Sequence, residues 1–353
     1  MQVDSKESVF DEGLDVNALI LTLWRQKIVI LCVSLLVAIL AAAYAFLAVP
    51  VYEAKAFIIP PTRNDIEILN YGRTAANDLA PLTVKDVYTV FIRNLQAESL
   101  RRDFFNDTYL PATGKHEDPK GVLYEKLSKD LSISIVGKDA GDRYSLAIQN
   151  TKPELAVKWV QLYVDRAGEL AAKEINQNIS GEAGIHARNL FQKVLSLREV
   201  AEKARNDAIV RLREALVVAK AIGLEKPAVI NSNSSNSLGL SGNMSGELSY
   251  MRGTKALEAE LANLEARKSD DPFIFKLRDV ETKYNFYKQL EANFQEAKVF
   301  RLDGVIEVPD APVKPKKALI IIGGLILGFM LGVVIALFRS SLTINSDRVK
   351  ERV

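Results

Sequence analysis

Two long stretches near the two ends of the chain contain only uncharged residues, most of them large and apolar. They cover residues 28–49 and 318–338. A helix of about 20 residues rises roughly 30 Å, which is the thickness of the hydrocarbon core of a bilayer. A buried helix of a soluble protein rarely stays apolar on every side over this length. Each stretch therefore predicts a membrane-spanning helix.

The first stretch has the features of a retained anchor rather than of a cleaved signal peptide. It begins after 27 residues, and its small residues at positions 41–43 lie inside the apolar run instead of beyond it. Two spans place residues 1–27 and 339–353 on one side of the membrane and residues 50–317 on the other. Lys and Arg flank both sides about equally, so charge alone leaves the orientation open. We expect the tails in the cytoplasm of a bacterium and the central region in the periplasm.

Between the spans, short segments with a β-type pattern lie close to each membrane end. Four segments have alternating or β-branched composition: 52–59, 131–136, 144–149 and 305–308. The second and third are joined across a Gly141-Asp142 turn signal and predict a hairpin. Residues 83–105 place apolar side chains at helical spacing. Together these segments predict a membrane-proximal α/β base made of residues 50–153 and 301–317.

The rest of the central region, residues 154–300, has the pattern of a long helical hairpin. No proline interrupts residues 154–222, and apolar side chains repeat there every three or four positions, which indicates a heptad stripe. The stripe consists of Leu190, Val194, Leu197, Ala201, Ala204, Ala208, Ala215, Val218 and Ile222. Three glycines weaken the first half of this helix, so we expect a kink or break there. They are Gly168, Gly181 and Gly184.

The return path of the hairpin begins after a polar Ser/Asn-rich loop at residues 231–246. Farther along, Asp271-Pro272 has the form of a helix start for the segment that follows. The apolar positions of the two paths predict a seam between them. The seam candidates are Leu190, Val194, Leu197, Leu257, Leu261 and Leu264. Such a seam either packs within one chain or joins neighbouring copies.

Residues able to do chemistry are sparse. The chain has 46 Lys and Arg against 44 Asp and Glu, so its net charge of +2 gives no reason to expect a nucleic-acid partner. Its single Cys excludes an intrachain disulfide. Its two histidines, His116 and His186, have no Cys or carboxylate at metal-ligand spacing and are interpreted as solvated. With no phosphate-binding motif either, we expect no enzyme, no cofactor and no metal site.

Glycines recur at every fourth position of the second apolar stretch. They are Gly324, Gly328 and Gly332, with Gly323 beside the first of them. In lipid, such a strip lets another helix approach closely and gain van der Waals contact. The partner helix is the first apolar stretch, a second copy or another membrane protein.

Prolines recur at every third position immediately before this stretch. Pro309, Pro312 and Pro315 favour an extended, polyproline-type segment that cannot donate ladder hydrogen bonds at those positions. The segment either transmits position between the base and the membrane or acts as a linker. In the second case its lysines, Lys314 among them, anchor it to lipid head groups.

The order of these parts resembles the chain-length determinant family, the class 1 polysaccharide co-polymerases. The resemblance covers nearly the whole chain and rests on YEAKAFIIPP at 52–61, NTKPELAVKWVQLYV at 150–164, and the proline-spaced segment that runs into the glycine-rich second span. It implies an α+β inner-membrane protein in which two transmembrane helices flank a periplasmic α/β base with a long extended helical hairpin. It also implies assembly of copies of this chain into a ring.

Members of that family set the modal length of a lipid-linked polysaccharide, such as the O-antigen of lipopolysaccharide, by acting on the membrane polymerase. The partners implied are therefore the chain itself, the polymerase and the bilayer, and contact with the growing glycan is compatible with the role. Class 2 relatives carry or recruit a tyrosine kinase and have a tyrosine-rich tail. Residues 339–353 contain no tyrosine, from which we expect class 1.

Three other interpretations remain open at this stage. A transmembrane sensor also has two spans, but the residues after 338 are too few for an output domain. A periplasmic adaptor of an export system shares the helical hairpin but usually has one span and a lipoyl-like module. A class 2 exopolysaccharide or capsule co-polymerase whose tyrosine kinase is a separate chain is distinguished from class 1 only by its genetic context or by the polymer that is exported.

Overall fold

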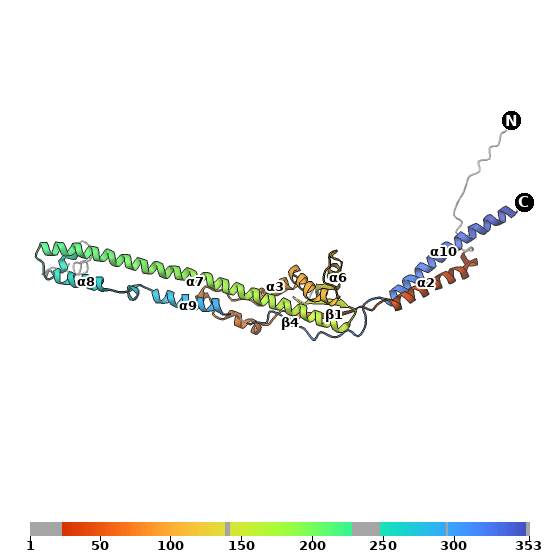
Figure 1. Ribbon diagram of the computed structural model, residues 1–353, viewed down its shortest axis with the longest axis horizontal. Helices are drawn as coiled ribbons and strands as arrows, with labels where there is room; N and C mark the ends of the chain where they lie inside the picture. Colours follow the sequence, from red (N-terminus) through yellow and green to blue (C-terminus); the bar gives the residue numbers. More distant parts are fainter. Residues whose placement is uncertain (1–22, 138–141, 228–247, 294–295, 351–353) are drawn as a thin grey trace, which may run out of the picture. The chain divides into compact units, whose positions relative to one another are not determined.

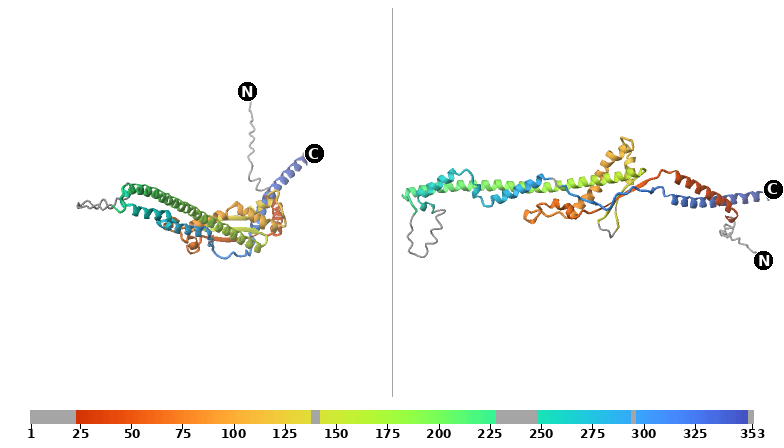
Figure 2. Two further views of the ribbon diagram at one scale, coloured as in Figure 1. Left: turned by 60° about the vertical axis from the view of Figure 1, so that its left-hand side comes forward. Right: turned by 90° about the horizontal axis from the view of Figure 1, so that it is seen from below.

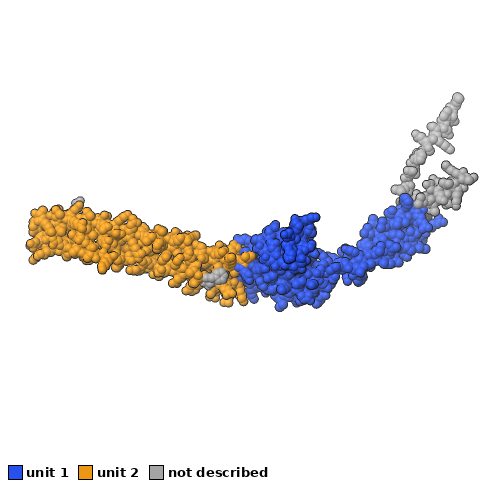
Figure 3. All heavy atoms as spheres, in the orientation of Figure 1, with its two compact units in different colours: residues 1–61, 91–169, 299–353 blue, residues 62–90, 170–298 orange. Residues whose placement is uncertain are grey.

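The computed structural model describes residues 23–137, 142–227, 248–293 and 296–350, with side chains described as far as Arg339. Most of the predicted N-terminal tail and the whole predicted loop 231–246 lie outside the described residues. The chain divides into two compact units, each assembled from segments far apart in sequence (Figure 3). Unit 1 comprises residues 1–61, 91–169 and 299–353, and unit 2 comprises residues 62–90 and 170–298.

Unit 1 contains a four-stranded antiparallel sheet in the order β2-β3-β1-β4. The strands are β1 (Tyr52–Ile59), β2 (Leu131–Ile135), β3 (Tyr144–Asn150) and β4 (Arg301–Leu302). The structure confirms the first strand and the hairpin predicted from the alternation of polar and apolar residues. The register pairs Ala54 with Ile148, and both side chains are buried.

The predicted strand at residues 305–308 is wrong in its position. The strand that pairs with β1 is Arg301–Leu302, a few residues earlier. The Asp303 N–H donates to the Phe57 carbonyl, and Gly304 then turns with a φ of 97°, which ends the pairing. Val305 is 89% exposed, so its β-branched side chain does not indicate a strand here.

The helices of unit 1 pack against the sheet around a group of aromatic side chains. They are the second part of α3 (Val84–Leu95), α4 (Glu98–Phe104), α5 (Leu110–Ala112), α6 (Val122–Asp130) and the start of α7 (Pro153–Ala221). The predicted helix 83–105 is two helices, because Ala97 adopts an extended backbone between them. Phe91 stacks on Phe300 with 4.5 Å between ring centroids, and the Tyr163 hydroxyl donates to the Leu95 carbonyl at 3.2 Å.

In unit 2 the continuation of α7 is covered by two shorter helices that run back along it, α8 (Thr254–Ala266) and α9 (Leu277–Ala292) (Figure 1). The described residues of unit 2 also include the first part of α3 and the short 3₁₀ segments η1 (Asn64–Asn70), η2 (Ala75–Asn77), η5 (Ser249–Arg252) and η6 (Asp271–Phe273). The return path of the hairpin is therefore two helices joined by a non-helical segment, rather than one continuous helix.

The predicted break in the long helix is wrong, since α7 is continuous over 69 residues. Two of its three glycines lie where a neighbouring side chain occupies the space of a Cβ. A Cβ on Gly168 would stand 2.7 Å from the Phe300 ring, and one on Gly184 would stand 2.8 Å from the Glu291 carboxylate. Close packing thus accounts for these glycines, and the backbone stays helical through them.

The helix start predicted at Asp271-Pro272 is also wrong. These residues form only the short η6, and α9 begins at Leu277, directly after Lys276 in the left-handed region with a φ of 61°. The Asp271 carboxylate accepts from the Arg198 guanidinium at 2.9 and 2.8 Å, so it is engaged by α7 instead of capping a helix of its own.

The two apolar stretches are helices that lie side by side, α2 (Lys27–Leu47) and α10 (Lys317–Lys350) (Figure 2). Lys27–Leu47 and Lys317–Arg339 are each long and apolar enough to cross a membrane. The helix α10 continues past residue 338 to Lys350, so the predicted tail 339–353 begins as a continuation of the helix.

Candidate functional site

The glycine strip of α10 faces α2 of the same chain. A Cβ placed on Gly328 would stand 2.8 Å from the Ser34 Cα, and one on Gly332 would stand 3.0 Å from the Ile30 Cα. A Cβ on Gly324 would collide with the Ala41 side chain. Because these three positions carry no side chain, the two helices touch backbone to backbone. In lipid this close approach supplies much of the attraction between helices.

Gly323 does not belong to this packing face. The sequence pattern groups it with the other three glycines. A Cβ on Gly323 would meet no atom within 4 Å. Adjacent residues in an α-helix are rotated by about 100° from each other, so Gly323 points away from the direction that Gly324 faces. The functional strip is therefore the three glycines spaced by four.

The proline-spaced segment is hydrogen-bonded to the chain that leaves α2. The Val51 N–H donates to the Lys314 carbonyl at 3.0 Å, and the Val313 N–H donates to the Val51 carbonyl at 2.8 Å. Pro309, Pro312 and Pro315 cannot donate, which leaves Val313 and Lys314 as the residues that pair. The two segments that join the base to the apolar helices are thus tied to each other just outside them.

A charged network lies on β1 beside this junction. The Glu53 carboxylate contacts the Lys55 ammonium at 2.8 Å and accepts from the Gln149 amide at 2.7 Å. Burial alone would raise the pKa of Glu53. The hydrogen bonds from Lys55 and Gln149, with the charges of Lys55 and Lys314, outweigh it and hold that pKa below its ordinary value. Glu53 is therefore ionised and paired at neutral pH.

The six seam candidates lie inside the hairpin of unit 2. Leu190, Val194 and Leu197 pack with Leu277 and Val280 of α9. Leu257, Leu261 and Leu264 of α8 pack with Leu212, Ala215 and Ala219 of α7. All six positions therefore contribute to contacts within the chain.

The seam shifts by one residue along α7, which the heptad pattern did not predict. Leu212 and Ala219 are buried, whereas Val218 is 44% and Ile222 is 57% exposed. A straight α-helix drifts by about 20° per heptad relative to a strict seven-residue repeat. After three heptads from Leu190, position 212 lies nearer the original face than position 211 does, so the stripe continues one residue later.

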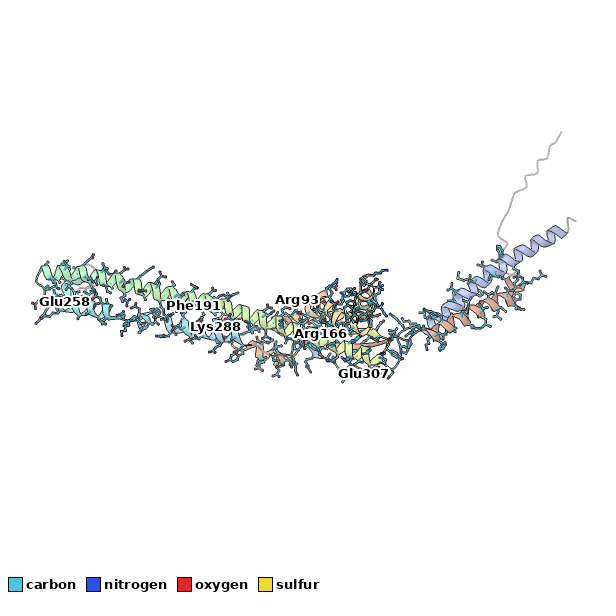
Figure 4. All side chains as sticks on the ribbon, viewed as in Figure 1. Arg93, Arg166, Phe191, Glu258, Lys288 and Glu307 are labelled. Carbon is cyan, nitrogen blue, oxygen red and sulfur yellow. The ribbon has the colours of Figure 1, made fainter. Side chains whose placement is uncertain are left out.

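An aromatic cleft between α7 and α9 was missed at the sequence level. It has a volume of about 560 Å³, and Phe191 and Lys288, both labelled in Figure 4, are among the residues that line it. Phe191 is 43% exposed and lies 5.8 Å from Tyr284, measured between ring centroids. Nearby, His186 stacks on Tyr287 at 4.9 Å and is half-buried, so its interpretation as a solvated histidine is wrong.

Comparison with family models matches two parts of the chain. Residues 12–108 match the chain length determinant protein model. Residues 275–341, which include α9, the proline-spaced segment and most of the apolar part of α10, match the model of a G-rich domain described on tyrosine kinases.

Curated relatives align over almost the full chain. The chain is 25% identical to the ECA polysaccharide chain length modulation protein of Salmonella typhimurium, over 93% of this chain and 95% of that protein. It is 20% identical to a chain length determinant protein of Escherichia coli, over 96% of each. It is 23% identical to that of Shigella flexneri, over 94% of each.

Solved structures share the fold. A full-length bacterial polysaccharide co-polymerase superposes with a TM-score of 0.65 at 19% identity, covering 94% of this chain and 98% of that one. The wild-type lipopolysaccharide O-antigen chain-length regulator of Shigella flexneri superposes with a TM-score of 0.54 at 15% identity, covering 74% of this chain and 99% of that one. The chain thus matches the chain length determinant model in its N-terminal part and is similar to curated chain length determinant proteins over nearly its full length.

Proposed function

We propose that this protein sets the modal length of a lipid-linked polysaccharide, the O-antigen of lipopolysaccharide, by acting on the membrane polymerase that joins its repeat units. The observation that carries the proposal is the similarity to chain length determinant proteins over nearly the full length of the chain. The pairing of α2 with α10 through the glycine strip supports it. The protein lies in the inner membrane with its tails in the cytoplasm and residues 50–317 in the periplasm.

The protein works as a scaffold and without a reaction of its own. Copies of the chain assemble into a ring, and contacts through the spans, the base or the hairpin engage the polymerase. A ring around the polymerase and the glycan would hold the two close together. This raises the effective concentration of each near the other, without any new chemical step. The glycine strip is occupied within one chain, so the contacts between copies and with the polymerase use other faces.

Deletion of the gene tests this function. We expect a clustered distribution of O-antigen lengths on a polysaccharide gel to become a broad, unclustered one while the total amount of polymer is unchanged. Restoring the gene on a plasmid brings the cluster back. An unchanged distribution, or complete loss of polymer, would contradict the proposal. The first outcome means that another polysaccharide or process is controlled, and the second indicates an essential polymerisation or export component.

A second candidate is a class 2 co-polymerase that controls an exopolysaccharide or capsule together with a separate tyrosine kinase. The match of residues 275–341 to a G-rich domain described on tyrosine kinases favours it. In that case deletion leaves the lipopolysaccharide ladder unchanged and alters the amount or mass of exported polymer. Affinity purification of the full-length protein from its own cells would then also recover a tyrosine-phosphorylated kinase.

A further inference from the structure

A cleft of about 270 Å³ in unit 1 opens beside the junction of the base with the apolar helices. It lies between the chain that leaves α2, the ends of β3 and α6, and the first turns of α7. Its lining includes Val51, Lys126, Lys152, Trp159 and Lys314. Nothing in the account of chain-length control above uses this cleft.

The cleft is strongly positive. Lys126, Lys152 and Lys314 line it, and none of the three has an oxygen of a described acidic residue within 4.0 Å of its ammonium group. Asp130 is the acidic residue among its described lining residues. Burial raises the pKa of Asp130, against the attraction of Lys126 and Lys314. The neighbouring Glu53 forms its salt bridge with Lys55, so three lysines and one acidic residue, Asp130, line the cleft.

The walls of the cleft are rigid. Trp159 and Tyr109 are 6% and 5% exposed, and their ring centroids lie 5.4 Å apart. Lys126 is on α6, Lys152 directly precedes α7, and Lys314 is held through its backbone by Val51. Three lysines from three separated segments therefore line one cleft together with two packed aromatic rings.

The chain places this cleft at the membrane surface. Val51 follows the end of α2 at Leu47 by four residues, and Lys314 precedes the start of α10 at Lys317 by three. An extended residue spans at most about 3.6 Å, so the cleft lies within roughly 15 Å of both apolar helix ends. The head-group regions on the two sides of a bilayer add about 10–15 Å in total to its hydrocarbon core. The Val51 and Lys314 edge of the cleft is therefore within reach of the lipid head groups when these helices span.

We propose that this cleft binds the phosphate of a membrane lipid through Lys126, Lys152 and Lys314. An ammonium group is a compact point charge suited to phosphate oxygens, and three of them match a diphosphate better than a single phosphodiester. Two lipids supply this chemistry, an anionic phospholipid and the polyprenyl diphosphate that carries a growing glycan. The second source rests on the proposed function, whereas binding of a lipid phosphate does not.

The test uses the full-length protein in phosphatidylcholine nanodiscs. The chain has two tryptophans, so Trp24→Phe leaves Trp159 in the wall of the cleft as the sole tryptophan. The probes are geranylgeranyl diphosphate, dioctanoyl phosphatidylglycerol and inorganic diphosphate, and the readout is Trp159 fluorescence. We expect saturable binding of the lipid diphosphate. Stronger binding of phosphatidylglycerol would instead assign the cleft to phospholipid.

The matched variants remove three charges inside or outside the cleft. K126Q/K152Q/K314Q is expected to raise the dissociation constant by at least tenfold, because it removes all three ammonium groups that would contact the phosphate oxygens. K298Q/K316Q/K317Q removes the same charge outside the lining of the cleft and is expected to change the dissociation constant less than twofold. Lys152→Glu alone provides a charge reversal if the triple variant does not fold.

Three results would overturn the proposal. These are no saturable response to either lipid, equal weakening in both triple variants, or inorganic diphosphate binding as tightly as the lipid probes. The measurement is made on purified protein, so its outcome is independent of the polysaccharide gel that tests the proposed function. If the protein binds the lipid but its deletion leaves polymer length unchanged, the proposed function is contradicted and the lipid-binding proposal is not.

Discussion

Gly328 of α10 lies directly against the backbone of Ser34 in α2, at a distance where a Cβ on the glycine would stand only 2.8 Å from the Ser34 Cα. Real Cβ atoms do not approach another carbon this closely, so any side chain at this position has to separate the helices. One helical turn away on the same side, Gly332 meets Ile30 in the same manner. The pairing of the two apolar helices therefore depends on residues that have no side chain.

Gly328→Leu is expected to separate α2 from α10 and broaden the length distribution of the polymer. Gly323→Leu is the matched control, since it adds the same side chain to the same helix where no atom lies within 4 Å. Both variants are expressed in the deletion strain at equal membrane levels and compared on polysaccharide gels. Wild-type banding in both would show that close approach of the spans is not needed for length control.

Leu257→Ala is expected to loosen α8 from α7. Leu257 is fully buried against Leu212, Ala215 and Ala219, and its truncation leaves a cavity that costs about 2–5 kcal/mol. Leu195→Ala, at a position that is 43% exposed, is expected to change the free energy of unfolding by less than about 0.5 kcal/mol. Urea unfolding of the detergent-solubilised full chain, followed by circular dichroism, compares them. Similar midpoints for the two variants would contradict the packing described for α8.

Arg198 connects α7 to the return path of the hairpin through Asp271 of η6 and Glu281 of α9, at 2.8 Å each. The hydrogen bond from Arg198 lowers the pKa of Asp271, against a smaller opposing effect of burial. A carboxyl with a lowered pKa in the folded state stabilises the fold above its ordinary pKa of 3.8. That stabilisation disappears as the pH falls through the lower folded value.

Arg198→Gln is therefore expected to lower Tm at neutral pH, with a difference from wild type that shrinks below about pH 4 as the Asp271 carboxylate becomes protonated. Lys203→Gln breaks an exposed pair with Glu199 inside α7 and is expected to have little effect. Thermal unfolding of the full chain at several pH values measures both. A Tm difference for Arg198→Gln that stays constant down to acid pH would contradict a role for the ion pair.

Tyr163 makes the base sensitive to alkaline pH. Burial raises the pKa of this phenol to about 12, from an ordinary value of 10. The stabilisation by neutral Tyr163 is complete below pH 10 and is lost as the pH rises toward 12. At neutral pH, Tyr163→Phe loses the hydrogen bond to the Leu95 carbonyl, worth about 1 kcal/mol.

Between pH 10 and 12 the wild type is expected to lose about 3 kcal/mol relative to Tyr163→Phe, since each pKa unit corresponds to about 1.4 kcal/mol. The variant is therefore the less stable protein at pH 7 and the more stable one near pH 12. Urea midpoints across this range give the comparison. A gap between the two proteins that does not change with pH would show that Tyr163 ionises as freely in the folded state as in the unfolded one.

The elements that were predicted correctly are those whose pattern is local. Two uncharged stretches define α2 and α10, and alternation on both sides of a turn signal defines β2 and β3. The errors arise where a distant residue decides the outcome. Gly168 reads as a helix breaker, but Phe300, more than a hundred residues away, occupies the space beside it. The sequence around Asp271 predicts a helix cap, but in the structure the Asp271 carboxylate accepts a hydrogen bond from the distant Arg198.

The candidate sites divide in the same way. Spacing by four identified Gly324, Gly328 and Gly332, because helix periodicity is visible in sequence. The cleft lined by Lys126, Lys152 and Lys314 could not be predicted from the sequence. The three lysines belong to separate segments that come together only in the folded unit with its antiparallel sheet. Of the three, the sequence singled out only Lys314, as part of the proline-spaced segment.

Reconstitution tests the central claim most directly. The purified chain is combined in one membrane with its polymerase and lipid-linked repeat units, and both the total number of repeats joined and the length distribution of the product are measured. We predict that adding the chain concentrates the products around one length and leaves the total unchanged. A distribution that is the same with and without the chain would contradict the account, as would repeat-joining activity of the chain in the absence of the polymerase.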